Sequence, residues 1–218
     1  MSLLQHGEQC EVAEAISRIE RDTDAEIVTV LAEQADDYAY IPLLWAGLLA
    51  LIVPGAIWVI ASWFNLDTTG IEGPWQILLV QWLTFVALAL VFRLPGLTTR
   101  LIPRRVRYWR AANLARRQFL EQNLHRTEAA TGVLIFVSEA ERYVEILVDQ
   151  GISRRLDNAA WGTIVKDFTR KVRSGQTRQG FLDCIEACGE LLKTHVPATH
   201  ERDELPNRLI VLDRSAIG

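Results

Sequence analysis

The sequence has few cysteines and contains two long stretches without any charge. Three of the 218 residues are cysteine, and this small odd number favours a reducing compartment over a framework of disulfides. There is also no Gly-x-Ser-x-Gly, no phosphate-binding loop and no His-Glu-x-x-His. These absences exclude serine hydrolases with a nucleophile elbow, P-loop NTPases and zinc proteases of the His-Glu-x-x-His type.

The two uncharged stretches cover residues 41–64 and 75–92, which are 24 and 18 residues long. A helix needs about 20 apolar residues to cross a bilayer core about 30 Å thick. The second stretch carries Gln76 and Gln81, and it reaches that length if its helix begins near Ile71. We predict that both stretches are transmembrane helices. The alternative is a pair of buried helices in a soluble protein, although a domain of this size has little need for two unbroken apolar helices.

The charges that flank the two stretches predict an orientation. The spacer of residues 65–74 contains Asp67 and Glu72 but no base, whereas residues 93–117 contain eight arginines and no acid. Short loops rich in Lys and Arg stay in the cytoplasm, so we expect two spans in the inner (plasma) membrane with both termini cytoplasmic. No secretory signal is expected in residues 1–24, because they carry six acidic side chains.

The arginines after the second stretch have a further possible role in lipid binding. They form a basic cluster that we predict to face the lipid, comprising Arg100, Arg104, Arg105, Arg107 and Arg110. Such a cluster can bind anionic headgroups at about 1 kcal/mol per charge. The orientation rule alone also accounts for these charges, so they do not indicate nucleic-acid binding.

The remaining sequence predicts one α/β domain split by the membrane hairpin. Residues 1–40 and 93–196 would form the domain, with residues 197–218 as a C-terminal tail. Apolar spacing predicts helices over residues 5–21, 104–124, 157–172 and 179–195, and strands over residues 26–32, 132–138 and 141–149. The first two strands flank a helix and should be parallel, with helices covering the sheet. The stretch 209–212 remains open between strand and coil.

Three segments of this domain resemble one protein family. They are "TDAEIVTVLAE" (residues 23–33), "TGVLIFVSEAERYVEILVDQGI" (residues 131–152) and "RLDNAAWGTIVKDF" (residues 155–168). Together they resemble the TPM family, named for the thylakoid phosphatase motif. The resemblance implies a small mixed sheet flanked by helices, and it is similar to a bacterial variant with two internal membrane helices. It also implies an acid-phosphatase activity with metal-associated acidic residues.

The chain departs from the family pattern at two acidic positions. The family has Asp-Asn-Gly just before the second strand, where this chain has Ala130, Thr131 and Gly132, so the family's acid is absent. The family's aspartate at the start of the long helix aligns with Asn158, one place after Asp157, whereas Asp149 is retained. Asp149, Asp157 and Asn158 are therefore the candidate ligands for Ca²⁺ or Mg²⁺, since hard cations bind several oxygens. In the alternative interpretation Asp157 only caps its helix and Asp149 ends a strand.

A second possible metal site lies on the last predicted helix. Cys184, Cys188 and His195 fall on one helix face, which is compatible with a thiolate and imidazole site. Cysteine is also among the most buried residue types, so packing in the core is the favoured interpretation.

Three functions follow as hypotheses from these observations. The leading one is a membrane-anchored cytoplasmic module that binds a membrane-protein partner without catalysis or cofactor. The second is a weak metal-dependent phosphomonoester hydrolase, in which Asp149 and Asp157 hold the cation. The third is a sensor of anionic lipid that uses the basic cluster.

Overall fold

The computed structural model describes residues 4–38, 40–64, 73–92, 94, 102–199, 205–206 and 208–213, apart from the side chain of Asn158. The described part forms two compact units. The first combines Met1–Asp37 with Arg107–Gly218, and the second is Tyr38–Val106. Segments on both sides of the apolar hairpin therefore build one domain.

The first unit contains both helices and strands, as the sequence predicts. The helices of the chain are α1 (His6–Glu20), α2 (Tyr40–Trp63), α3 (Pro74–Val91), α5 (Arg104–Glu121), the 3-10 helix η1 (Leu124–Arg126), α6 (Gln150–Ser153), α7 (Asn158–Arg173) and α8 (Thr177–His195). The strands are β1 (Glu26–Ala32), β2 (Gly132–Ser138), β3 (Tyr143–Val148) and β4 (Leu209–Leu212).

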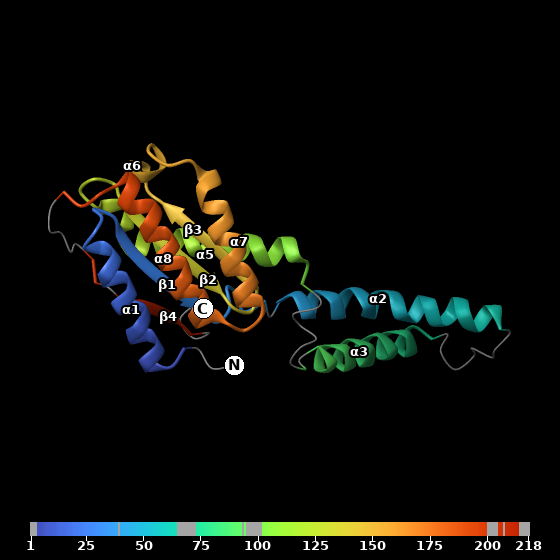
Figure 1. Ribbon diagram of the computed structural model, residues 1–218. Coiled ribbons are helices and arrows are strands. Elements are labelled where there is room, and N and C mark those ends of the chain that lie inside the picture. The colour runs from blue at the N-terminus through green and yellow to red at the C-terminus, as the bar shows by residue number, and fades with distance from the viewer. Residues whose placement is uncertain are drawn as a thin grey trace. The chain divides into compact units, whose positions relative to one another are not determined.

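The four strands form one mixed sheet in the order β3-β2-β1-β4 (Figure 1). β1 and β2 are parallel, with Glu26 opposite Gly132 and Ala32 opposite Ser138. β3 is antiparallel to β2, and β4 is parallel to β1. β1 comes from the segment before the hairpin, yet it lies between two strands from the segment after it. The predicted mixed sheet, split by an inserted hairpin, is confirmed.

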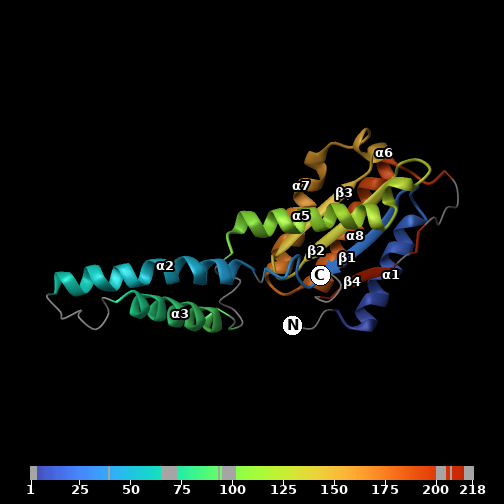
Figure 2. The same ribbon diagram turned by 180° about the vertical axis from the view of Figure 1, so that it is seen from behind.

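Helices cover both faces of this sheet. α1, α7 and α8 lie on one face and α5 lies on the other, as the two opposite views show (Figures 1 and 2). Ile27 and Leu31 point to the three-helix side, whereas Val28 and Val30 pack with Ala111 on the α5 side. Every residue of β1 and β2 is buried as a result. This explains why apolar side chains point to both faces of each strand instead of alternating with polar ones.

The three helices on one face pack closely where glycines lie on α8. A Cβ atom on Gly189 would lie 2.1 Å from Cδ1 of Ile19 in α1. A Cβ atom on Gly180 would lie 2.5 Å from the ring of Phe168 in α7. These two glycines allow α8 to approach both neighbouring helices.

The second unit contains the two apolar helices, α2 and α3, which pack against each other. Both are long and apolar enough to cross a membrane. Only 11% of the most apolar window of α2 and none of that of α3 is buried inside the chain, which is unlike a helix of a soluble core. Large side chains such as Trp58 (59% exposed) and Leu79 (60% exposed) project outward. The buried residues of α2 are instead small, with Ala46 and Ala50 among them.

Candidate functional site

Asp149 lies where β3 ends and α6 begins. It is the acid of the family pattern that this chain retains. Its Oδ1 accepts a hydrogen bond from the backbone N–H of Gln150 at 2.6 Å, so Asp149 caps α6. Its Oδ2 is buried and has no hydrogen-bond partner among the described residues. A buried carboxylate oxygen without a partner is costly, and a cation is one way to satisfy it.

The backbone around Asp149 is tied to the start of β2. The N–H of Asp149 donates to the carbonyl of Gly132 at 2.9 Å, and the N–H of Gly151 donates to that of Ala130 at 2.8 Å. A Cβ atom on Gly151 would lie only 2.2 Å from the carbonyl oxygen of Ala129. The position therefore requires glycine. The "DQG" sequence after β3 thus has a structural explanation in addition to any chemical one.

The other two predicted ligands lie at the start of α7. Asp157 is the N-cap of this helix, and its Oδ1 accepts from the N–H of Ala159 at 3.4 Å. Asn158 is the first residue of the helix, and its side chain lies outside the described residues. Among the residues that the structure describes, no three His, Cys, Asp or Glu side chains gather as a metal-ligand group. Binding of Ca²⁺ or Mg²⁺ by Asp149, Asp157 and Asn158 therefore stays a prediction.

By the family resemblance, Ala130 takes the place of the acid, and the next side chain is that of Thr131. This side chain is buried, and its hydroxyl donates to the backbone carbonyl of Asp24 at 2.7 Å. Its N–H donates in turn to the hydroxyl of Thr127 at 3.0 Å. Thr131 therefore joins the start of β2 to the residues before β1. Neither Ala130 nor Thr131 supplies a carboxylate here.

Two further acids lie at the opposite end of the sheet. Glu141 is 3% exposed, and its Oε2 accepts hydrogen bonds from the Ala35 N–H (3.1 Å) and from the Ser138 hydroxyl. Glu139 accepts from the Thr177 hydroxyl at 2.9 Å. Because β2 runs away from Gly132, these groups follow the far end of that strand. They fix the turn between β2 and β3.

A half-buried polar cluster on β3 was not predicted from the sequence. The Tyr143 hydroxyl donates to Oε2 of Glu145 at 3.0 Å, and the Tyr143 ring lies 5.3 Å from that of Tyr108 in α5. Burial raises the pKa of the Glu145 carboxyl, while Tyr143 and Arg116 act in the opposite direction. Burial and the Glu145 carboxylate raise the pKa of Tyr143. Only the pairing of α5 with an edge strand brings these residues together, so local spacing gave no signal.

The cysteines of α8 are part of the core. Cys184 and Cys188 are buried, and their Sγ atoms lie 3.9 Å apart. The contact with Cys188 and burial both raise the pKa of the Cys184 thiol. Nδ1 of His195 lies 2.8 Å from the Leu191 carbonyl oxygen in the same helix. The interpretation of these cysteines as core residues is confirmed.

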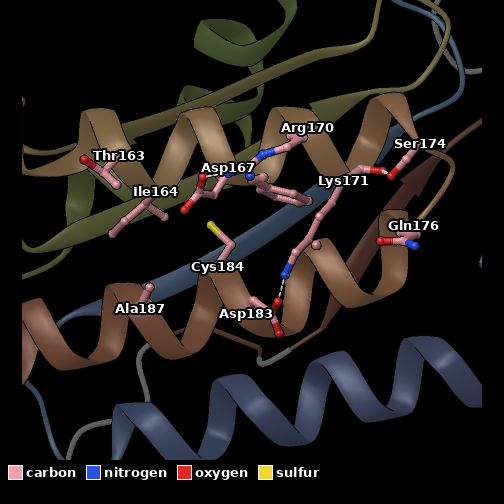
Figure 3. A pocket seen from close by; sticks show the side chains of 12 residues that line it. Thr163, Ile164, Asp167, Arg170, Lys171, Ser174, Gln176, Asp183, Cys184 and Ala187 are labelled. Carbon is pink, nitrogen blue, oxygen red and sulfur yellow. Dashed lines mark hydrogen bonds and ion pairs between the residues drawn. The ribbon is translucent and has the colours of Figure 1, made fainter.

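A groove of about 780 Å³ lies between α7 and α8 (Figure 3). Lys171 forms an ion pair with Asp183 across it, and Arg170 pairs with Asp167 on its rim. Cys184 lies on its α8 side (Figure 3). The charged groups therefore neutralise each other, and the groove offers a ligand no net charge of one sign.

The arginines of the basic cluster lie in different environments. Arg110 turns inward: its Nε lies 3.0 Å from Oδ2 of Asp36, and its guanidinium lies 5.1 Å from the Trp109 ring. Arg104 and Arg105 are exposed, Arg107 is half-buried, and Arg100 lies outside the described residues.

Five side chains of α5 are exposed in the first unit, and three of them share one side of the helix, its outward face, apart from the Arg117–Glu121 ion pair. These three are Trp109 and Leu120, each 58% exposed, and Arg116. Their spacing of seven and four residues places them on one side of the helix. The face thus combines apolar and cationic side chains.

Comparison with known proteins agrees with the fold. Residues 101–191 match the family model of the TPM domain. The NMR structure of BA42 protein from the psychrophilic bacterium Bizionia argentinensis sp. nov. is similar, with 18% identity and a TM-score of 0.58 over 96% of each chain. At this identity the likeness shows a shared fold and no more. No curated protein matches the chain. The chain therefore carries a TPM domain, as its strand and helix motifs indicate.

Proposed function

We propose that this chain is an integral protein of the inner (plasma) membrane, with α2 and α3 as its two spans. The exposed apolar side chains of both helices support this, because lipid is the solvent that favours them. β1 and β2 pair in one sheet although the hairpin separates them in sequence. The chain must therefore cross the bilayer an even number of times between them. The Arg-rich flank favours the cytoplasm as the side that holds the domain.

We further propose that the TPM domain acts by binding a membrane-protein partner and has no catalytic role. The observation that carries this is that the polar groups at this site form hydrogen bonds and helix caps within the domain itself. Ala130 stands in place of the family's acid, Thr131 donates to a backbone carbonyl, and Asp149 and Asp157 each cap a helix. A hydrolase of this family type would instead need those carboxylates around a cation.

Hydrolysis of p-nitrophenyl phosphate by the full chain in detergent micelles tests this proposal. The assay compares the chain with its Asp149→Ala variant, each with Ca²⁺, with Mg²⁺ and with a chelator. We expect the two proteins to show equal background turnover under every condition. We also expect no increase in the melting temperature on cation titration, since only a bound ligand stabilises by mass action.

One observation favours the metal-dependent phosphatase as a second candidate. Oδ2 of Asp149 is buried and lacks a hydrogen-bond partner among the described residues, as an oxygen reserved for a cation would. In this case Asp149 and Asp157 would hold Ca²⁺ or Mg²⁺, and the cation would polarise a phosphoryl group. Cation-dependent turnover that disappears in Asp149→Ala would establish this candidate and refute the binding role as the whole function.

The outward face of α5 favours a third candidate, which is the binding of anionic lipid. An amphipathic helix with tryptophan and arginine on one side suits the headgroup region. The test uses the full chain in a Cys10→Ser background, labelled with an environment-sensitive dye at Trp109→Cys, in phosphatidylcholine nanodiscs with and without phosphatidylglycerol. A dye signal that depends on phosphatidylglycerol, and that decreases with salt and with Arg116→Glu, would support it. A signal independent of lipid charge would refute it.

A further inference from the structure

Gln81 places an amide group well inside the apolar hairpin. At 1.5 Å per residue it lies about 10 Å along α3 from Pro74 and about 15 Å from Val91. If α3 spans the membrane, this amide lies in the hydrocarbon core, beyond the reach of interfacial water. Gln76 is the other glutamine of α3, and it lies within one turn of Pro74, where water and headgroups are available.

Among the residues that the structure describes, this amide has no hydrogen-bond partner, although the Gln81 side chain is only partly exposed. It opens into a groove of about 440 Å³ between the two helices, lined also by Gly47, Ala50, Leu51, Trp82 and Phe85. An amide without a hydrogen bond in hydrocarbon costs several kcal/mol. A partner from outside the chain would remove that cost.

Gly47 and Gly55 both leave open space on α2, and Gly47 is the one that lines this groove. A Cβ atom on Gly47 would meet no atom within 4 Å. By contrast, glycines at tight contacts in the domain would clash at 2.1–2.6 Å. The open space at Gly47 adjoins the groove that contains Gln81. Small residues at such positions let the backbone of another helix approach closely.

We propose that the hairpin pairs with a second copy of this chain through this groove, with the two Gln81 amides hydrogen-bonded to each other. A primary amide is both donor and acceptor, so two identical amides at the same membrane depth satisfy one another. A two-fold axis through the contact brings the same groove of both copies together. The inference rests on the membrane placement of α2 and α3 proposed above.

Energy transfer between labelled copies of the full chain in phosphatidylcholine vesicles tests the proposal. Cys10 is exposed whereas Cys184 and Cys188 are buried, so maleimide dyes can be attached at Cys10. Transfer is measured while the lipid-to-protein ratio is raised. The variants are Gln81→Leu, which removes the amide, and Gly47→Leu, which fills the groove. Gln76→Leu is the matched control.

We expect the unaltered chain and Gln76→Leu to associate equally. Gln81→Leu should weaken association by about three- to thirtyfold, the range for a polar contact between membrane helices. Gly47→Leu should also weaken it. Oxidative cross-linking in a Cys10→Ser background should join Phe85→Cys pairs and leave Leu79→Cys pairs apart. Phe85 lines the groove one turn after Gln81, whereas Leu79 lies on the opposite side of α3.

Three results would overturn the proposal. A monomeric unaltered chain would show that a second copy does not occupy the groove. Unchanged association of Gln81→Leu would place the contact elsewhere. Release of the chain from membranes by alkaline carbonate would overturn the membrane placement and the dimer with it. Because extraction is measured separately on each variant, that failure is distinct from loss of association by inserted protein.

Discussion

Single polar residues in the TPM domain mainly hold its chain together. Glu141 binds the N–H of Ala35 across a long sequence separation, and Thr131 binds the carbonyl of Asp24. Capping by Asp157 is predictable from sequence, because Asp is a favoured N-cap. The unpartnered oxygen of Asp149 and the Tyr143–Glu145 pair are not, because both depend on tertiary neighbours.

The role of Asp157 is testable with two variants. Asp157→Ala should lower the free energy of unfolding by about 1 kcal/mol, the usual effect of losing an N-cap. Asp157→Asn keeps an acceptor for the Ala159 N–H and should remain close to the unaltered chain. Thermal unfolding in detergent, with and without Ca²⁺, measures both. A calcium-dependent stabilisation that Asp157→Asn abolishes would mean that the carboxylate binds a cation.

Glu145 should make stability depend on pH. Burial raises the pKa of its carboxyl in the folded chain, so the folded state holds this proton more tightly than the unfolded state does. The resulting stability is complete below the pKa of the unfolded state, about 4.3, and is lost as pH rises through the raised pKa. Glu145→Gln should therefore be the more stable protein at pH 7, and its advantage should vanish near pH 4.

Melting temperatures of the two proteins between pH 4 and pH 8 measure this difference. Glu186→Gln, which removes an exposed carboxyl on α8, is the matched control. An advantage of Glu145→Gln that stays constant across this range would contradict the burial of an ionisable carboxyl.

At the scale of elements, the best-predicted strands are those with the most apolar sequences. The predicted bounds of β1 and β2 match the structure, because each is a seven-residue run that is buried on both faces. β3 begins at Tyr143, two residues later than predicted, since Arg142 has φ of +53° in the turn. β4 was left undecided because its four residues become a strand only by pairing with β1.

Tertiary contacts also decide which glycines are needed for the close packing of helices. Gly180→Ala should lower the free energy of unfolding by about 1–3 kcal/mol, because the new methyl group would collide with the buried Phe168 ring. Gly162→Ala in α7 is the matched control, since its Cβ would meet nothing within 4 Å. It should gain roughly 0.5–1 kcal/mol from helix propensity. Thermal unfolding that ranks the two variants in the reverse order would contradict the close packing of α7 and α8.

At the scale of the whole molecule, the sequence predicted both the hairpin and the split domain. Charge-free length identified the two helices, and the buried-strand pattern identified β1 and β2 as partners. The candidate metal site was less predictable, because convergence of side chains depends on loops and caps that have no periodic signal. The central role of β1 in the sheet requires both flanks of the hairpin to lie on one side of any membrane that it crosses.

The most direct test of the central claim is the labelling of single cysteines in intact cells with a membrane-impermeant maleimide. Cys10 reports on the domain, and Thr68→Cys in a Cys10→Ser background reports on the spacer between α2 and α3. We expect Thr68→Cys to react from outside and Cys10 to react only after the membrane is permeabilised. Labelling of Cys10 from outside, or of both positions from the same side, would contradict a two-span protein with a cytoplasmic TPM domain.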